Sequence, residues 1–375
     1  MKINIPLSIY IHIPFCRAKC LYCDFLSQAD CATLFAPYVD AVCAHIAAKA
    51  GDFAGYEVET VFFGGGTPTV LAAADLARIL DVLRNNFTFS AAVNITTEAN
   101  PETVDAAYLQ ALHGAGFNRI SFGVQSFNDT FLTAVGRLHS AARAKSAVRE
   151  AAAAGFDDIN IDLMFALPFQ TIEDFAACLD TAIALPVTHI SCYALTIEDG
   201  TPLAGRHDLL DAVCDEDTDR AMYHLAAERL TQNGFEHYEI SNWARPGKLC
   251  RHNLGYWTGR QYAGFGAGAH SLIDSKRLAN TDDINAYVSG DFAPIVMEEL
   301  DIDAAMAEFV ILGLRLTQGI NAAEFQRRFG RGLTDTYGAI FAHLRAQGLL
   351  EPIKNGIKLT KKGLDLSNIV FAELV

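Results

Sequence analysis

The chain has 375 residues with a formal net charge of −15, and 51% of its residues are hydrophobic, enough to bury a large core. The negative charge argues against a nucleic-acid partner, whose phosphates it would repel. Nine cysteines, an odd number in a chain without a recognisable export signal, argue against a disulfide framework and favour a cytoplasmic location.

Residues 7 to about 195 alternate short apolar runs with Ala- and Leu-rich stretches, which is the pattern of repeated βα units. The apolar residues 1–16 contain His12 and two prolines, so we expect a first strand there and not a signal peptide. Six units predict an open, partial (β/α)6 barrel. We expect strands at 7–13, 58–63, 92–98, 119–124, 158–165 and 188–195, and helices near 33–50, 73–86, 103–115, 140–154 and 171–185.

The sequence changes character after residue 200. A predicted helix near 215–233 is followed by Trp- and Gly-rich loops, and from about 295 by three helices and a hairpin that turns at Asn355 and Gly356. This tail looks like a winged-helix domain, but its charges are balanced, so we expect packing or partner contact and not DNA binding. The predicted divisions are 1–200 for the barrel, 201–294 for a barrel extension with loops, and 295–375 for the α+β tail.

Polar or glycine-rich segments occur where the predicted strands end. GGGTP, residues 64–68, follows the second strand, Glu98 ends the third, Gln125 follows the fourth, and Asp162 lies in the fifth. Any one of them alone would be an ordinary turn or cap. Because parallel α/β barrels build their active sites at the carboxyl edge of the sheet, their convergence predicts a site there.

Three cysteines, Cys16, Cys20 and Cys23, form a C-x3-C-x2-C pattern directly after the first strand. Three thiolates on one loop can bind three irons of a 4Fe-4S cluster and leave the fourth iron without a protein ligand. A structural zinc site would need a fourth protein donor. Three unliganded thiols in a loop would be open to oxidation. A cubane cluster therefore accounts for the pattern better than either alternative.

The segment YIHIPFCRAKCLYC resembles the signature of radical S-adenosylmethionine (SAM) proteins, and GGGTP resembles their second motif. The resemblance implies that SAM binds the open iron and is cleaved to methionine and a 5′-deoxyadenosyl radical. It also implies that Arg137 approaches the SAM carboxylate and that Asp162 holds the ribose hydroxyls. The full set of SAM-binding residues implied in this way is Tyr10, Tyr22, Gly65, Gly66, Thr67, Glu98, Gln125, Arg137, Asp162 and Ala194.

The whole chain resembles the branch of this superfamily that contains the oxygen-independent coproporphyrinogen III dehydrogenases. Those enzymes carry an additional cysteine two places after the third and a long N-terminal segment, whereas this chain has Phe25 and fifteen residues before Cys16. Its RHNLGYW segment instead resembles the H-N-x-x-Y-W pattern of the HemW-type haem chaperones. Two alternatives stay open, namely such a dehydrogenase and a radical SAM methyltransferase that degrades haem.

In that segment, His252 is the expected axial ligand of haem iron. Tyr256 and Trp257 would lie against the porphyrin, and Asn253 would orient the histidine. The same residues could instead form a packed loop. Cys250 is another candidate ligand, although a lone thiol in such a position more often packs as a small hydrophobe.

The family resemblance also predicts the partners. It implies binding of haem and delivery to acceptor haem proteins such as respiratory cytochromes, at a membrane surface, and it is the one ground for a homodimer. No stretch of eighteen apolar residues occurs, so we expect no membrane-spanning helix. Whether the chain is also an enzyme is left open, because the cluster motif is present but both dehydrogenase features are absent.

Overall fold

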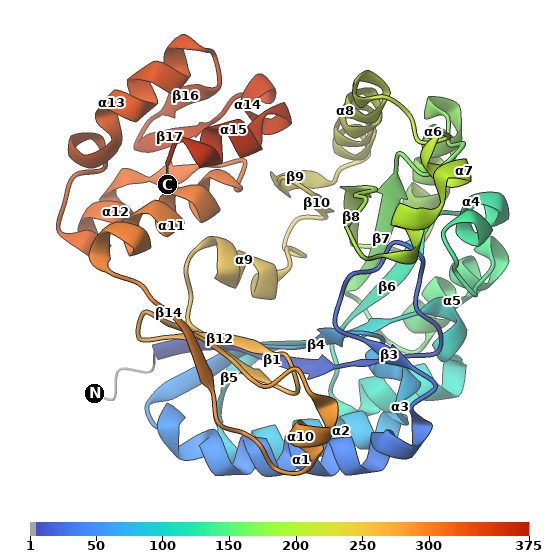
Figure 1. Ribbon diagram of the computed structural model, residues 1–375. Helices are drawn as coiled ribbons and strands as arrows, with labels where there is room; N and C mark the ends of the chain where they lie inside the picture. The colour runs from blue at the N-terminus through green and yellow to red at the C-terminus, as the bar shows by residue number, and fades with distance from the viewer. Residues whose placement is uncertain (1–4, 375) are drawn as a thin grey trace.

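The computed structural model describes residues 5–374. Residues 1–4 and 375, which belong to the first and last predicted segments, lie outside the described residues. Its largest element is a 12-stranded sheet in the order β14-β13-β12-β11-β1-β4-β5-β6-β7-β8-β10-β9. The sheet curves into an open barrel with its helices outside (Figure 1). Its centre confirms the six predicted parallel strands, which are β1 (Ile5–Ile13), β4 (Tyr56–Gly65), β5 (Thr88–Ala99), β6 (Arg119–Gln125), β7 (Ile159–Phe165) and β8 (His189–Ala194).

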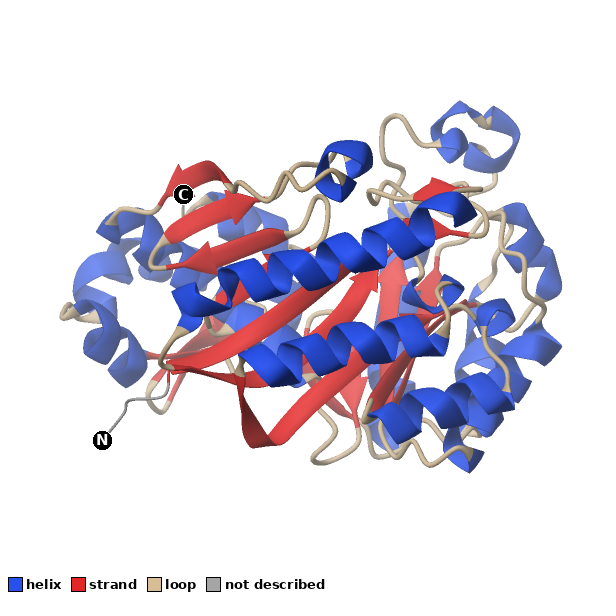
Figure 2. Cartoon of the chain, turned by 90° about the horizontal axis from the view of Figure 1, so that it is seen from below, coloured by secondary structure: helices blue, strands red, loops and turns tan. Residues whose placement is uncertain are grey.

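Amphipathic helices cover the outer face of this sheet (Figure 2). In α2 (Ala73–Asn86), for example, Leu76, Ile79, Leu80 and Leu83 recur every three or four residues and are all buried. The predicted helices are confirmed as α1 (Phe35–Lys49), α2, α3 (Ala106–Ala115), α5 (Ala141–Ala153), α6 (Ile172–Ile183) and α8 (Glu216–Gln232), whereas the short α4 (Asp129–Ala134) was not predicted. Within residues 5–374, no helix combines the length and apolar character needed to cross a bilayer.

The segment predicted as Trp- and Gly-rich loops contains strands. β11 (Tyr262–Phe265) pairs with β1 in parallel, and β12 (His270–Ile273), β13 (Lys276–Ala279) and β14 (Ile295–Glu299) continue the sheet antiparallel. Beyond β8, the sheet is extended by β10 (Asn242–Ala244) and β9 (Glu236–Glu239). β11 was not predicted because it contains Gly264 and lacks the apolar alternation of an ordinary strand. Glycine is needed there, since a Cβ on Gly264 would come within 2.2 Å of the His270 carbonyl oxygen.

The tail forms the three predicted helices and the predicted hairpin. It has a buried core of its own, which includes Met306, Val310, Phe325 and Leu344. The strand β14, which the sequence placed in the tail, belongs to the main sheet. The elements of the tail are α11 (Ile302–Leu314), β15 (Ile320–Asn321), α12 (Ala322–Phe329), α13 (Leu333–Ala346), β16 (Leu350–Ile353), β17 (Gly356–Leu359), α14 (Lys361–Asp365) and α15 (Ser367–Ala372).

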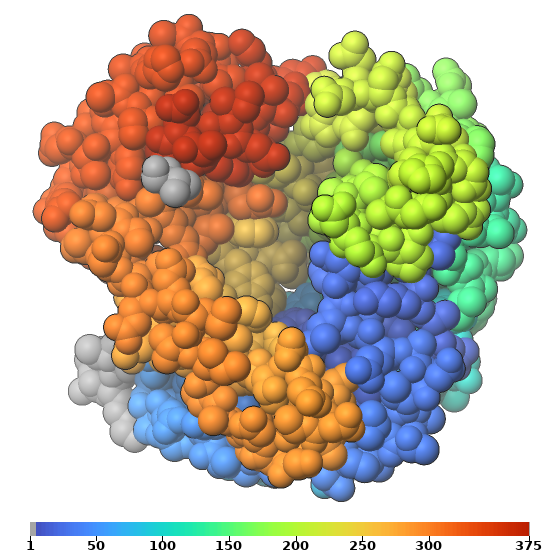
Figure 3. All heavy atoms as spheres, viewed as in Figure 1, coloured from blue at the N-terminus to red at the C-terminus, as the bar shows by residue number. Residues whose placement is uncertain are grey.

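A short helix, α9 (Arg251–Trp257), lies between the barrel and the tail (Figure 1). On the tail side, the Arg315 guanidinium stacks over the Trp257 ring at 4.3 Å, and Arg328 donates hydrogen bonds to the carbonyl oxygens of Thr258 and Gly259. The space-filling view shows a hollow between tail and barrel with the segment around α9 at its base (Figure 3). The RHNLGYW segment is therefore a helix held from two sides, and not a loop.

Candidate functional site

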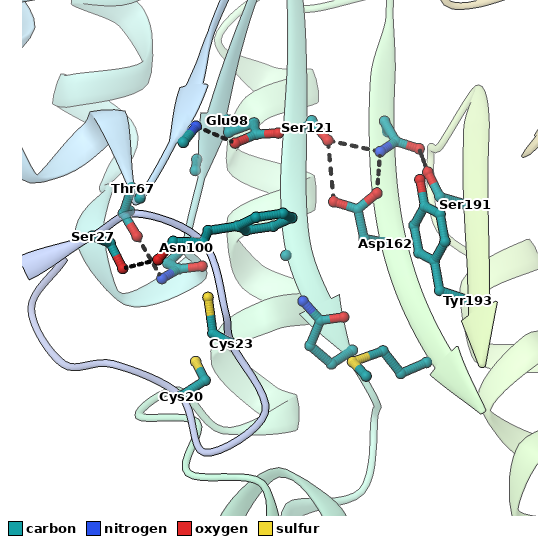
Figure 4. Close-up of a pocket in the computed structure, with 18 of the residues that line it drawn as sticks. Cys20, Cys23, Ser27, Thr67, Glu98, Asn100, Ser121, Asp162, Ser191 and Tyr193 are labelled. Carbon is teal, nitrogen blue, oxygen red and sulfur yellow. Dashed lines mark hydrogen bonds between the residues drawn. The ribbon is translucent and has the colours of Figure 1, made fainter. Parts of the chain in front are cut away.

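A cavity of about 530 Å³ lies at the carboxyl edge of the parallel strands. The six central strands, the loop that follows β1 and the helix α9 all contribute to its wall. Figure 4 shows the part of this wall that holds Cys20, Cys23 and the ends of the central strands. The sequence-predicted residues therefore meet in one place, as the strand-end argument required. Lining the cavity are Tyr10, Cys16, Cys20, Tyr22, Cys23, Gly65, Gly66, Thr67, Glu98, Gln125, Arg137, Asp162, Ala194 and His252.

The three thiols of the cluster motif are free and half-buried. Cys16 ends the short strand β2 (Phe15–Cys16), and Cys20 and Cys23 lie on the loop beyond it (Figure 4). Burial raises the pKa of the Cys16 and Cys23 thiols, so a bound metal centre is needed to hold both as thiolates at neutral pH. In a cubane cluster each thiolate binds a different iron, so the three sulfur atoms need not converge on one point.

The loop that carries these thiols is fastened to β1 by His12. Its Nδ1 lies 3.0 Å from the Tyr10 hydroxyl, and its Nε2 lies 3.0 Å from the Leu26 carbonyl oxygen. Because a carbonyl oxygen only accepts, Nε2 carries the ring proton and Nδ1 accepts from Tyr10. Burial lowers the pKa of His12, which keeps this neutral form. His12 thus fixes both the loop and the Tyr10 side chain.

Glycine is required at the second motif. A Cβ on Gly65, whose φ is +110°, would lie 2.5 Å from the His12 ring, and a Cβ on Gly66 would lie 2.5 Å from the Phe15 carbonyl oxygen. The backbone can therefore pass directly beside the cysteine loop. Thr67 closes this contact, because its hydroxyl lies 3.5 Å from the Cys16 sulfur and accepts a hydrogen bond from Asn100 at 3.0 Å.

Two carboxyl groups face the cavity from β5 and β7, the strands on either side of β6 (Figure 4). The Glu98 Oε2 accepts from the Gly65 N–H at 3.3 Å, and burial, together with the charge of Asp162, raises the pKa of Glu98 to about 8. The Asp162 Oδ1 accepts from Asn160 at 2.8 Å, and its Oδ2 accepts from Ser121 at 3.3 Å. Glu98 is therefore mostly protonated at pH 7 until a cationic group binds beside it.

Arg137 connects the cysteine loop to β6. Its Nη1 donates to the Cys20 sulfur at 3.3 Å, and its Nη2 donates to the Asn100 side chain at 2.6 Å and to the Gly123 carbonyl oxygen. Its buried Nε has no hydrogen-bond partner among residues 5–374. An unsatisfied buried guanidinium N–H costs free energy, so this atom is suited to an anionic ligand group.

Gln125, at the end of β6, has a φ of +63°. A side chain other than glycine adopts this left-handed conformation at a cost, and such strain is concentrated at functional sites. The conformation places Gln125 on the cavity wall.

His252 is buried, with 1% of its surface exposed. Its Nδ1 lies 2.9 Å from the Thr60 hydroxyl, its Nε2 lies 3.0 Å from the Tyr256 hydroxyl, and its ring stacks on Phe62 at 5.0 Å. Burial, followed by the charges of Arg260 and Arg119, lowers the pKa of His252 to about 3, so the imidazole is neutral. The neutral ring is chemically able to bind iron, but its Nε2 is hydrogen-bonded to the Tyr256 hydroxyl, which a metal at that nitrogen would have to displace.

Two details of the predicted haem motif are wrong. The partners of His252 are Thr60 and Tyr256, and not Asn253, which lines the cavity instead. Trp257 packs under Arg315 of the tail and is not part of the cavity wall. Cys250 is buried, as predicted for a small hydrophobe, but it also lines the cavity.

Sequence reasoning missed several polar residues that support the site. Asn100 holds both Thr67 and Arg137, and Asn160 holds Asp162. Asn160 lies two residues before Asp162 on the same strand, and alternate residues of a strand share a face, so the period of two could have found it. His189, which hydrogen-bonds Asn160, had no such signal, because its strand neighbour comes from another part of the chain.

Comparison with known proteins identifies the family. Residues 10–182 match the Radical SAM superfamily model, and residues 300–366 match the HemN C-terminal domain. The heme chaperone HemW of Mycobacterium tuberculosis is 37% identical over 99% of this chain and 95% of its own length. The corresponding values for HemW of Bacillus subtilis are 34%, 97% and 98%. The chain belongs to the HemW family.

A solved structure extends the comparison from this HemW-family chain to an enzyme. The coproporphyrinogen III oxidase HemN from Escherichia coli, a radical SAM enzyme, matches with a TM-score of 0.86 and 26% identity, over 99% of this chain and 90% of HemN. The match confirms the radical SAM barrel. Membership of this superfamily gives the chain a 4Fe-4S cluster and SAM as cofactors, and the three thiols, the glycine motif and the free Arg137 Nε fit them.

Proposed function

We propose that this chain is a haem chaperone, which binds haem beside its 4Fe-4S cluster and SAM and transfers it to acceptor haem proteins such as respiratory enzymes. One observation carries the proposal: α9 places a neutral, buried His252 in the wall of the cavity that also holds the three cysteines. Iron ligation through Nε2 would leave the ring proton on Nδ1, where the Thr60 hydroxyl at 2.9 Å can accept it. The names of the HemW relatives support the same function.

The residue roles follow from the cavity wall. Cys16, Cys20 and Cys23 would hold the cluster, which when bound supplies electrons and an open iron to SAM. The free Arg137 Nε would meet the SAM carboxylate, and Asp162 would accept hydrogen bonds from the ribose hydroxyls. The further contacts to SAM would come from Tyr10, Tyr22, Gly65, Gly66, Thr67, Glu98, Gln125 and Ala194.

The direct test is transfer. Protein with its cluster reconstituted under anaerobic conditions is titrated with haem, purified, and mixed with the haem-free form of a respiratory cytochrome subunit. We expect saturation at a single haem per chain, followed by appearance of the acceptor's own haem spectrum. Tight binding without any release would contradict the chaperone and favour a haem sensor or enzyme.

The structural similarity to HemN favours a second candidate, oxidative decarboxylation of coproporphyrinogen III. Against it, the position of the extra cysteine is taken by Phe25, which lines the cavity with 65% of its surface exposed. We expect no protoporphyrinogen when the reconstituted protein is incubated with coproporphyrinogen III, SAM and a reductant. Formation of protoporphyrinogen in that assay would identify the dehydrogenase and contradict the chaperone. In a separate incubation with haem, loss of the Soret band together with methyl transfer would identify the haem-degrading methyltransferase.

Glu98 predicts how SAM affinity depends on pH. SAM carries positive charge, and Glu98, with a pKa of about 8, attracts it only when ionised. Affinity should therefore rise with pH by up to about tenfold per unit below pH 8 and level off above it. In Glu98→Gln this rise should disappear, and affinity at pH 8.5 should be lower than in the wild type. Anaerobic titration calorimetry between pH 6.5 and 8.5 measures both, and a flat wild-type profile would remove Glu98 from the site.

Three predictions about partners and location are tested neither by the structure nor by the comparisons. They are the identity of the acceptor and its place at a membrane surface, a homodimer, and the cytoplasmic location. Light scattering of the purified protein measures the second of them.

A further inference from the structure

A chain of hydrogen bonds crosses the inside of the barrel from β9 to β7. The Tyr238 hydroxyl lies 2.8 Å from His189 Nε2, and His189 Nδ1 lies 2.6 Å from Asn160 Oδ1. Asn160 Nδ2 then donates to Asp162 Oδ1 at 2.8 Å and to the Ser121 hydroxyl at 2.7 Å. Figure 4 shows the end of this chain, where Ser121 and Asp162 face each other across the cavity wall.

The direction of each hydrogen bond is determined by chemistry. An amide oxygen only accepts, so His189 must carry its proton on Nδ1, and its Nε2 then accepts from the Tyr238 hydroxyl. His189 is 1% exposed, and burial together with the charge of Arg119 lowers its pKa well below the usual value, so the ring is neutral with one proton to place. The Asn160 oxygen therefore determines the tautomer of His189, and the Tyr238 hydroxyl, which can donate or accept, donates to the remaining ring nitrogen.

In this tautomer the His189 N–H and the side chain of Asn160 hold each other in one arrangement. With Oδ1 held by the His189 N–H, and also by the Ser191 hydroxyl at 3.3 Å, the Nδ2 group points at Asp162. If the amide were flipped, its oxygen would face the Asp162 carboxylate. The hydrogen bonds that Nδ2 donates to Asp162 and Ser121 would then be lost, which is unfavourable for buried groups. A donor facing Asp162 stabilises its ionised form, in which both oxygens accept hydrogen bonds.

We propose that His189 is a positioning residue for SAM, because it holds Asn160 in the orientation that keeps Asp162 a hydrogen-bond acceptor for the ribose hydroxyls. The inference rests on the proposed function, in which Asp162 contacts the ribose. His189 also lines the cavity, but only 1% of its surface is exposed, so we assign it no contact with SAM. Its effect reaches SAM through Asn160 and Asp162 alone.

The test compares two variants of His189 by anaerobic titration calorimetry with SAM. His189→Phe keeps a flat ring but cannot donate to Asn160, and we expect affinity to fall about tenfold, the loss typical of a weakened hydrogen bond to a charged group. His189→Gln retains an N–H donor, and we expect affinity within about threefold of the wild type. The 4Fe-4S absorption of both variants should equal that of the wild type.

A SAM analogue that lacks the 2′ and 3′ hydroxyls separates positioning from a general loss of structure. We expect wild type and His189→Phe to bind this analogue equally. An equal loss of affinity for SAM and the analogue in His189→Phe would overturn the proposal, and so would the absence of any loss for SAM.

Asp162→Asn distinguishes the inference from the proposed function beneath it. If this variant binds SAM like the wild type, the ribose contact of Asp162 is wrong and the proposed site fails with it. If Asp162→Asn weakens SAM binding while His189→Phe does not, Asp162 keeps its role and the positioning role of His189 is overturned alone.

Discussion

Replacing Cys20 with serine should abolish the 4Fe-4S absorption of the reconstituted protein and, with it, SAM binding. Serine removes one of the three thiolates on which the proposed cluster depends, and the alcohol oxygen is a poor substitute for a thiolate at iron. The variant should still fold, because Cys20 lies half-buried on a loop and outside the hydrophobic core. Iron and sulfide quantification, with the visible spectrum, measures the loss.

Cys31→Ser is the matched control for this experiment. Cys31 is also half-buried, and its thiol donates to the Ala29 carbonyl oxygen at 3.1 Å, a contact that serine can reproduce. It does not line the cavity. We expect a normal cluster in this variant. A normal cluster in Cys20→Ser, or its loss in Cys31→Ser, would show that the ligands were assigned wrongly.

Two substitutions on α9 should change haem affinity in opposite directions. His252→Ala removes the proposed iron ligand, so haem should bind at least about tenfold more weakly, with a shifted Soret band. Tyr256→Phe removes the hydroxyl that lies 3.0 Å from His252 Nε2, so haem no longer has to displace it. The hydrogen bond is worth about 1 kcal/mol, so this variant should bind haem about fivefold more tightly.

The pair of variants separates two roles for Tyr256. If Tyr256→Phe weakens haem binding as His252→Ala does, the hydroxyl contacts haem and does not compete for the histidine.

Because the pKa of His252 is about 3, haem ligation should persist unchanged from pH 8 down to pH 5.5, where an exposed histidine would be largely protonated. A Soret band that reverts near pH 6.5 would point to another, solvent-exposed ligand.

Periodicity predicted the barrel because its strands and helices repeat one simple pattern. β4, β5 and β7 are apolar runs between amphipathic helices, and each lies within a few residues of its predicted range. The same logic failed for β11, where Gly264 permits a close approach of the neighbouring β12 backbone and leaves no apolar alternation to detect. Short glycine-rich strands are specified by the close approach of a neighbouring backbone, and hydrophobic periodicity cannot detect this.

The site was predictable where a motif carries its own geometry. Cys16, Cys20 and Cys23 lie in one short loop, and their spacing alone brings them together. The haem motif was harder, because its geometry depends on whether the segment is a helix. In α9, His252 and Tyr256 are four residues apart and share a face, while Trp257 turns toward the tail. A loop prediction could not separate these directions.

The contacts of α9 with the tail have a consequence for haem release. The helix has seven residues, too few to be stable alone, so its place depends on Thr60 and Phe62 on one side and on Arg315 and Arg328 on the other. A protein that bound the tail and drew either arginine away would loosen the helix that carries the histidine. An acceptor that binds the tail would thus lower the affinity for haem without touching the haem site. Haem would then be released only while an acceptor is bound.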